Sequence, residues 1–146
     1  MTAPQQAQRY SVDVLGVMLT ITRNALPHVN VYSRIPDNLP QHLPLVVIRR
    51  TAGRSQAPKF ADRPWINTQC FTGGDDPFTD CNILCDQVRG AYFTAWHEQI
   101  VVPGVGWIVD IRESSGPEEL SDPDRPHFGR YQMTHEIRIR HDLRNL

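Results

Sequence analysis

The residues near the C-terminal end alternate between apolar and polar side chains, and this pattern limits the possible folds more than any other. Successive side chains of a strand point to opposite sides of a sheet, so residues 130–141 are predicted to form a strand with one covered and one open face. The apolar face would hold Tyr131, Met133, Ile137 and Ile139, and the polar face Gln132, Thr134, Glu136, Arg138 and Arg140. Another layer of structure must therefore cover the apolar face.

Two segments have the spacing of helices with one buried face. The stronger one, residues 77–97, follows two glycines, with Asp76 as the expected N-cap and Pro77 at the first helical position. Its predicted buried stripe is Cys81, Leu84, Cys85, Val88, Tyr92 and Ala95. The other helix is predicted to run from an N-cap at Ser11 to about Ala25 and to stop at Pro27. Its predicted buried stripe is Leu15, Met18, Leu19, Thr22 and Leu26.

Four further segments are predicted to be strands: residues 29–34, 45–50, 65–71 and 106–112. In the last of these, Trp107, Val109 and Ile111 are expected to share one side. Few helices are available to make crossovers between parallel strands. We therefore expect an α+β fold, with a mainly antiparallel (mixed) sheet of about four to five strands and both helices packed on one face.

The domain organisation is predicted to be simple. Residues 1–10 are polar and rich in glutamine, and we expect them to form a flexible N-terminal arm. Residues 11–146 would then form a single domain. Two long connections interrupt the predicted strands within it: a basic one at residues 51–64 and an acidic one at residues 114–129.

Composition excludes several classes of function. The net charge of −1 over 146 residues provides no field that would recruit nucleic acid or an anionic membrane. No stretch approaches the roughly 18 apolar residues of a membrane span, and the first ten residues lack the apolar core of a signal peptide. The cysteine count of three is odd and sparse, unlike a secreted disulfide framework. We expect the chain to fold in a reducing cytoplasm.

Catalytic and metal-binding signatures are also missing. The sequence contains no Walker A loop, GxGxxG, GxSxG or HExxH motif. Cys81 and Cys85 share a helix face and could hold a metal, but within an apolar stripe a free cysteine behaves as a small hydrophobe. The acidic residues 118–124 lack the spacing of an EF-hand loop, and His135 and His141 have no identifiable nucleophile beside them. We expect no enzyme, cofactor or metal site; a small cytoplasmic enzyme or metal-binding domain is the alternative from another class.

A family resemblance rests on a combination of segments. These are the proline-rich turn and LPLVVI strand within residues 31–53, the RPWINTQCF strand at 63–71, the helix after GGDDPF, and residues 111–140, where an SGP…DPDRP loop leads into the final strand. Together they cover most of residues 11–140. In this combination the chain resembles the tail terminator (tail completion) proteins of phages with long, non-contractile tails, in a form like that of actinobacterial phages.

The resemblance implies a non-enzymatic virion protein, assembled in the host cytoplasm. Copies would form a ring, typically a hexamer, on the head-proximal end of the tail tube. This ring would stop tube polymerisation and present a docking surface to the head connector, while genomic DNA passes through the lumen without being read. Its partners would be itself, the major tail tube protein and the connector or stopper protein. Another head–tail connector component, such as a stopper or adaptor, is the nearest alternative.

The two charged connections are the candidate contact surfaces, because head-to-tail contacts in a ring need two different patches on each subunit. Sheet edges could also pair between copies. The basic residues predicted to face the tail tube or another partner are Arg49, Arg50, Arg54, Lys59 and Arg63. The residues predicted to face other subunits or the connector are Glu118, Glu119, Asp122, Asp124, Arg125, Arg138 and Arg140.

Overall fold

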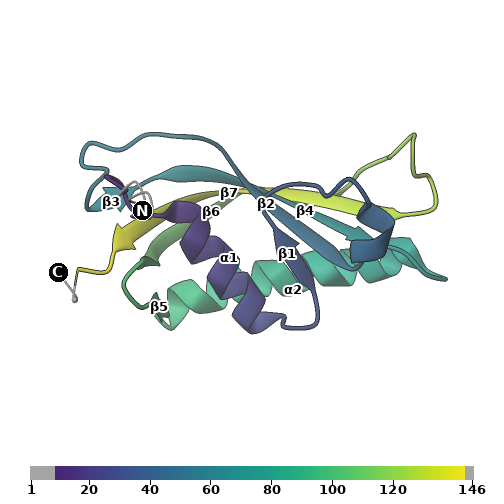
Figure 1. The fold of residues 1–146 in the computed structure, drawn as a ribbon, viewed down its shortest axis with the longest axis horizontal. Helices are drawn as coiled ribbons and strands as arrows, with labels where there is room; N and C mark the ends of the chain where they lie inside the picture. The colour runs from purple at the N-terminus through teal and green to yellow at the C-terminus, as the bar shows by residue number, and fades with distance from the viewer. Residues whose placement is uncertain (1–8, 144–146) are drawn as a thin grey trace, which may run out of the picture.

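The computed structural model describes residues 9–143, which fold as an α+β structure. Within this range there are two α-helices, a short 3₁₀ helix and seven strands (Figure 1). The helices are α1 (Val14–Ala25), α2 (Pro77–His97) and the 3₁₀ helix η1 (Leu39–His42). The strands are β1 (Asn30–Tyr32), β2 (Leu45–Gly53), β3 (Ala61–Asp62), β4 (Pro64–Thr72), β5 (Val101–Val102), β6 (Gly106–Glu119) and β7 (Gly129–His141). Most of the predicted N-terminal arm, residues 1–8, lies outside the described residues.

The strands form one mixed sheet in the order β1-β2-β4-β7-β6-β5, with β3 beside β7. Only the β1–β2 pair is parallel among the described strands. The prediction of four to five strands was too low. The two strands that it missed, β3 and β5, have two residues each, which is too short to produce a recognisable alternation.

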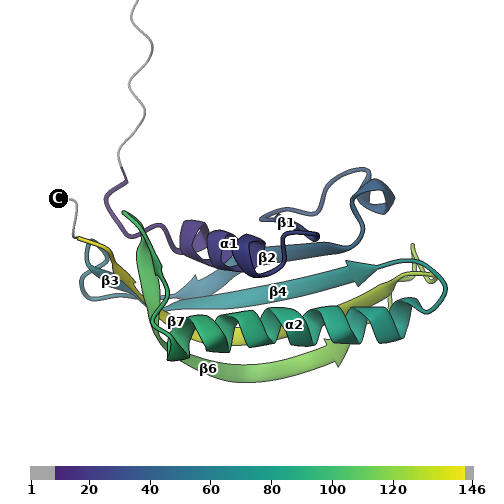
Figure 2. The ribbon, with the colours of Figure 1, turned by 90° about the horizontal axis from the view of Figure 1, so that it is seen from below.

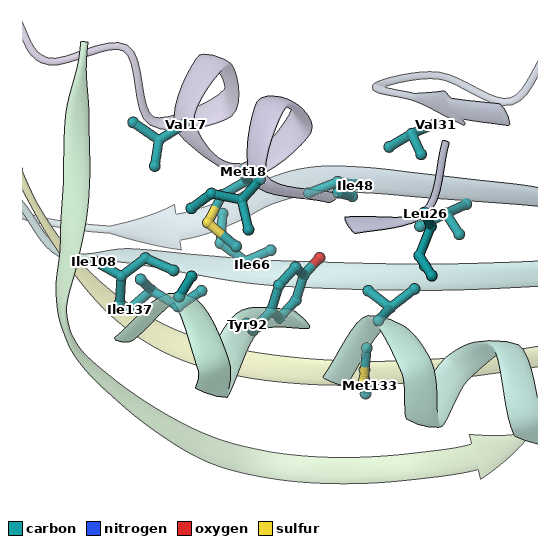
Figure 3. Packing of buried hydrophobic residues seen from close by; sticks show 14 of the residues in the cluster. Val17, Met18, Leu26, Val31, Ile48, Ile66, Tyr92, Ile108, Met133 and Ile137 are labelled. Atoms are coloured by element: carbon teal, nitrogen blue, oxygen red, sulfur yellow. The ribbon is translucent and has the colours of Figure 1, made fainter. Parts of the chain in front are cut away.

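Both helices contribute to the main hydrophobic core with one face of the sheet. Helix α2 lies across β4, β7 and β6, and α1 packs against α2 and the β2 side of the sheet (Figure 2). Met18 of α1, Tyr92 of α2 and Ile137 of β7 meet in this core (Figure 3). The alternation predicted for the final strand is confirmed, since Met133, Ile137 and Ile139 are fully buried.

Helix α2 matches its prediction closely, because its buried residues are the six that the spacing indicated. Asp76 occupies the N-cap position, but its side chain makes no capping hydrogen bond.

Helix α1 departs from its prediction in its start and in its buried face. Asp13, not Ser11, is the N-cap, and its Oδ1 accepts a hydrogen bond of 3.0 Å from the Gly16 amide. The buried residues are Val14, Val17, Met18, Ile21 and Thr22, while Leu15 and Leu19 are only partly buried. Apolar residues surround much of this helix, so spacing alone could not determine which side faces the core.

Both long connections are shorter than predicted, because strands extend into them. Strand β2 continues to Gly53 and β4 begins at Pro64, so the basic connection shrinks to residues 54–60 together with β3. Strand β6 continues to Glu119, leaving residues 120–128 as the acidic loop. Shifts in register interrupt the alternation of both strands. The register shift after Ile108 also changes which residues of β6 share a side. Trp107, Val109 and Ile111 were expected to do so, but the two residues buried in the core are Ile108 and Ile111.

The face of the sheet away from the helices is covered at one end only. There a second apolar cluster contains Leu39 of η1, Leu45 and Val47 of β2, and Phe71 of β4. Phe128, the last residue of the acidic loop, packs against this cluster. Along β7, this open face carries the polar and charged side chains of Gln132, Thr134, Glu136, Arg138 and Arg140.

Candidate interaction surfaces

The two charged segments lie at opposite ends of the sheet. Gly53 pairs with Pro64 at the basic end, whereas Glu119 pairs with Tyr131 at the acidic end. Figure 1 shows the basic connection beside β3 and the acidic loop beyond the start of β7, at the other end of the molecule. At about 3.4 Å per residue, the β7 residues Tyr131 and Arg138 are about 24 Å apart. One subunit thus presents two chemically different surfaces that do not touch each other.

The basic residues differ in how available they are to a partner. Arg54, Lys59 and Arg63 are exposed, and Arg49 is exposed on β2, opposite Asn67. Arg50 instead forms a bidentate ion pair with the buried carboxylate of Asp62, with N–O distances of 2.7 and 3.0 Å. Arg50 therefore holds β3 in place and is not free for another molecule.

A hollow of about 670 Å³ opens at the basic end, between residues 54–57, β3 and β7. Three arginines line it: Arg54, Arg63 and Arg138. Arg138 and Arg140, which are predicted to face other subunits or the connector together with the acidic residues, lie at the basic end. Strand pairing, which the sequence does not reveal, brings these separated arginines together.

At the acidic end, Asp122 stabilises the loop through hydrogen bonds to other residues of the same loop. It is 7% exposed, and its carboxylate accepts hydrogen bonds from the backbone amides of Asp124 and Arg125 and from Nε of Arg125. Burial acts to raise the pKa of Asp122, but the hydrogen bond and charge of Arg125 and the amide of Asp124 together hold it below its ordinary value. Asp122 and Arg125 are thus structural, while Glu118, Glu119 and Asp124 are exposed.

Two apolar hollows on the helix side were not predicted. One, of about 600 Å³, lies near the acidic end and is lined in part by Leu43, Ile83 and Phe128. The other, of about 470 Å³, lies between α1 and α2. Ile83 is 51% exposed. In the sequence, Ile83 stands among polar residues on the face of α2 opposite its buried stripe, and this could have indicated an exposed apolar surface here.

The cysteines pack as core residues, as predicted. All three are buried, and Cys81 Sγ donates a hydrogen bond of 3.1 Å to the Cys70 carbonyl. Burial raises the pKa of Cys81 to about 12, so its thiol stays protonated. Within residues 9–143, no group of three or more histidine, cysteine or acidic side chains is placed to hold a metal ion.

A chain of three ionisable side chains links α2 to the sheet. His135 of β7 is fully buried, and its Nε2 lies 3.2 Å from Glu113 Oε1. Arg89 of α2 donates a hydrogen bond of 2.6 Å to the other oxygen of Glu113. Burial lowers the pKa of His135, the charge of Arg89 adds to this effect, and Glu113 opposes it.

We expect the free energy of unfolding to fall as the pH drops below about 6.5, the ordinary pKa of histidine. The unfolded chain binds the His135 proton more readily than the folded chain, so acid favours unfolding until the folded pKa is passed. The contribution of His135 to this loss should grow steadily between pH 7.5 and 5.5. Urea unfolding of the wild type and of His135→Gln at both pH values measures the effect. An equal pH dependence in both proteins would contradict it.

None of the helices in the described part of the chain is long and apolar enough to cross a membrane.

The amino-acid sequence matches a protein family described as phage tail termination protein, over residues 10–144. A comparison with curated proteins found no match.

Proposed function

Because this chain belongs to the phage tail termination protein family, we propose that it caps the head-proximal end of the tail tube, stops tube polymerisation and forms the docking surface for the head connector. The family is a structural one and makes the chain a component of the virion tail. The observation that carries the proposal is the extent of the match: residues 10–144 include both α-helices and every described strand, so the whole fold belongs to the family.

The capping unit is proposed to be a ring of copies, typically six. A domain of this length has a radius of gyration of roughly 15 Å, so one copy cannot enclose a DNA duplex. A ring built by head-to-tail contacts needs two different patches on each subunit. The separated basic and acidic ends support this arrangement, because they supply two such patches.

Within the basic connection, Lys59 and Phe60 are proposed to contact the tail tube, outside the hollow that residues 54–57 line. Lys59 and Phe60 are exposed in this segment, and the Lys59 ammonium lies 5.9 Å from the centre of the Phe60 ring. Deleting the segment would disturb the fold, because the Pro58 and Phe60 carbonyls accept hydrogen bonds from the Val12 and His141 amides. Substitution is therefore the better test.

Polymerisation of purified tube subunits tests capping directly. Adding this protein should give shorter tubes at sub-stoichiometric amounts, because only tube ends bind it. Electron microscopy measures the tube lengths. An unchanged length distribution would overturn the proposal, whereas binding to the isolated connector without any effect on tubes would favour the stopper or adaptor alternative.

The same assay tests the loop assignment. K59E/F60S should weaken the effect on tube length at least about tenfold, because it removes the exposed charge and ring. Ile83→Ser is the matched control, since Ile83 is 51% exposed and lies near the acidic end. Equal activity of both variants would assign the tube contact to another surface.

A further inference from the structure

The two edges of the sheet are poorly suited to pairing with another chain. At the β1 edge, the Arg23 guanidinium donates hydrogen bonds of 3.1 and 2.7 Å to the Val31 carbonyl. At the β6 edge, Trp96 Nε1 donates a hydrogen bond of 3.1 Å to the Val109 carbonyl. Further along β6, Pro117 and repeated shifts in register interrupt the regular strand. Prolines, bulges and occupied carbonyls oppose strand addition. Contacts between copies are therefore expected to use side chains.

The arginine-lined hollow at the basic end carries a net positive charge. Arg54, Arg63 and Arg138 have no ion-pair partner among residues 9–143, and Asp62, which also lines the hollow, is neutralised by Arg50. Asp110 and Glu136 line an adjoining smaller hollow together with Arg63 and Arg138, and Asp110 lies opposite Arg138 on the neighbouring strand, but neither carboxylate forms an ion pair with these arginines. The guanidinium group suits bidentate contacts with planar carboxylates.

The acidic end carries a matching number of available carboxylates. Glu118, Glu119 and Asp124 are exposed and have no ion-pair partner within the described part of the chain. Glu118 only accepts a long hydrogen bond of 3.5 Å from Gln132. Asp122 and Arg125 keep the loop in shape, so these carboxylates are presented by an ordered segment.

We propose that the end of β6 and the acidic loop of one copy bind in the arginine-lined hollow of the next copy, with Glu118, Glu119 and Asp124 facing Arg54, Arg63 and Arg138. The inference rests on the proposed function, and it names the contact by which the ring is built. The sheet holds the two surfaces about 24 Å apart in one subunit, so the charges cannot neutralise each other internally. Joining two different patches in this way is a heterologous contact, which can close into a ring.

A protein partner fits the hollow better than a nucleic acid does. Asp110 and Glu136 stand beside it, and they would repel the continuous negative charge of a DNA backbone. Three carboxylates on the end of β6 and the acidic loop match the three arginines without crossing those acidic side chains. Binding of DNA through these arginines is an outcome of the test below.

Disulfide cross-linking detects the contact even when it is weak. Gln56 lines the hollow and Ser121 lies in the acidic loop, and both are exposed. The three native cysteines are buried, so they do not interfere. The full-length Q56C/S121C variant should form a ladder of intermolecular disulfides under mild oxidation, whereas each single variant should not. A double variant that cross-links no more than the single variants would overturn the proposal.

Charge reversal identifies the side chains involved. In the Q56C/S121C background, R54E/R63E/R138E should lower the cross-linking rate at least about tenfold, because like charges then face each other. Adding E118R/E119R/D124R to the same chain should restore the rate. The matched control is R34E/R49E, which changes two exposed arginines that line neither hollow and should leave the rate within about twofold. Circular dichroism confirms that each variant is folded.

The outcomes separate this contact from the proposed function. If adding E118R/E119R/D124R does not restore the cross-linking rate, the proposed contact is wrong. It is also wrong if R54E/R63E/R138E cross-links at the normal rate but loses affinity for duplex DNA. Tube length is read independently. If the wild type caps tubes but the cysteine ladder is absent, only the inferred contact fails; if the ladder forms but tubes are not capped, only the proposed function fails.

Discussion

Replacing Gly129 with alanine is expected to lower the free energy of unfolding by about 3 kcal/mol. Gly129 pairs with Thr72 where the first turn of α2 comes closest to the sheet. An added Cβ would overlap the Pro77 carbonyl oxygen and lie 2.6 Å from Thr72 Oγ1 and 2.7 Å from Cys81 Cβ. The Pro77 carbonyl also accepts a hydrogen bond from Thr72, so the backbone there cannot move away freely. Urea unfolding at a fixed protein concentration measures the change, because association would alter apparent stability.

Gly90→Ala is the matched control for this prediction. Gly90 lies inside α2, and a Cβ there would meet no atom within 4 Å. Alanine is favoured over glycine in a helix interior, so this variant should be more stable by about 1 kcal/mol. Equal stability of Gly129→Ala and the wild type would show that α2 does not approach the sheet as closely as described.

Replacing Ile137 with alanine is expected to cost about 3 kcal/mol, because it removes buried methyl groups and leaves a cavity. Ile137 is fully buried on the helix side of β7, in the same core as Tyr92 and Met18. The loss should appear as a lower urea midpoint with an unchanged slope.

Arg138→Ala is the control on the same strand. Its side chain is exposed on the opposite face, so the free energy of unfolding should change by less than about 0.5 kcal/mol. If Arg138→Ala were as destabilising as Ile137→Ala, the alternation of β7 would be wrong. A stable Arg138→Ala would also show that charge changes in the hollow act on assembly rather than on folding.

The strands and helices with regular patterns were predictable because their signal is local. The six buried residues of α2 and the alternation of β7 follow from spacing within one element. Helix α1 shows the limit of this reasoning. Val14 and Leu15 are both apolar, and only contact with α2 and the sheet determines that Val14 is buried and Leu15 is not.

The candidate surfaces show the same division between local and long-range information. The sequence alone determined that one basic and one acidic segment exist, since their composition is visible along the chain. Only the tertiary structure decided that Arg50 and Asp122 serve the fold and that Arg138 joins Arg54 and Arg63 in one hollow. The pairing of β7 with its neighbours places these two segments at opposite ends of the sheet. Such pairing joins residues far apart in the chain, and local composition and periodicity carry no record of which strands will meet.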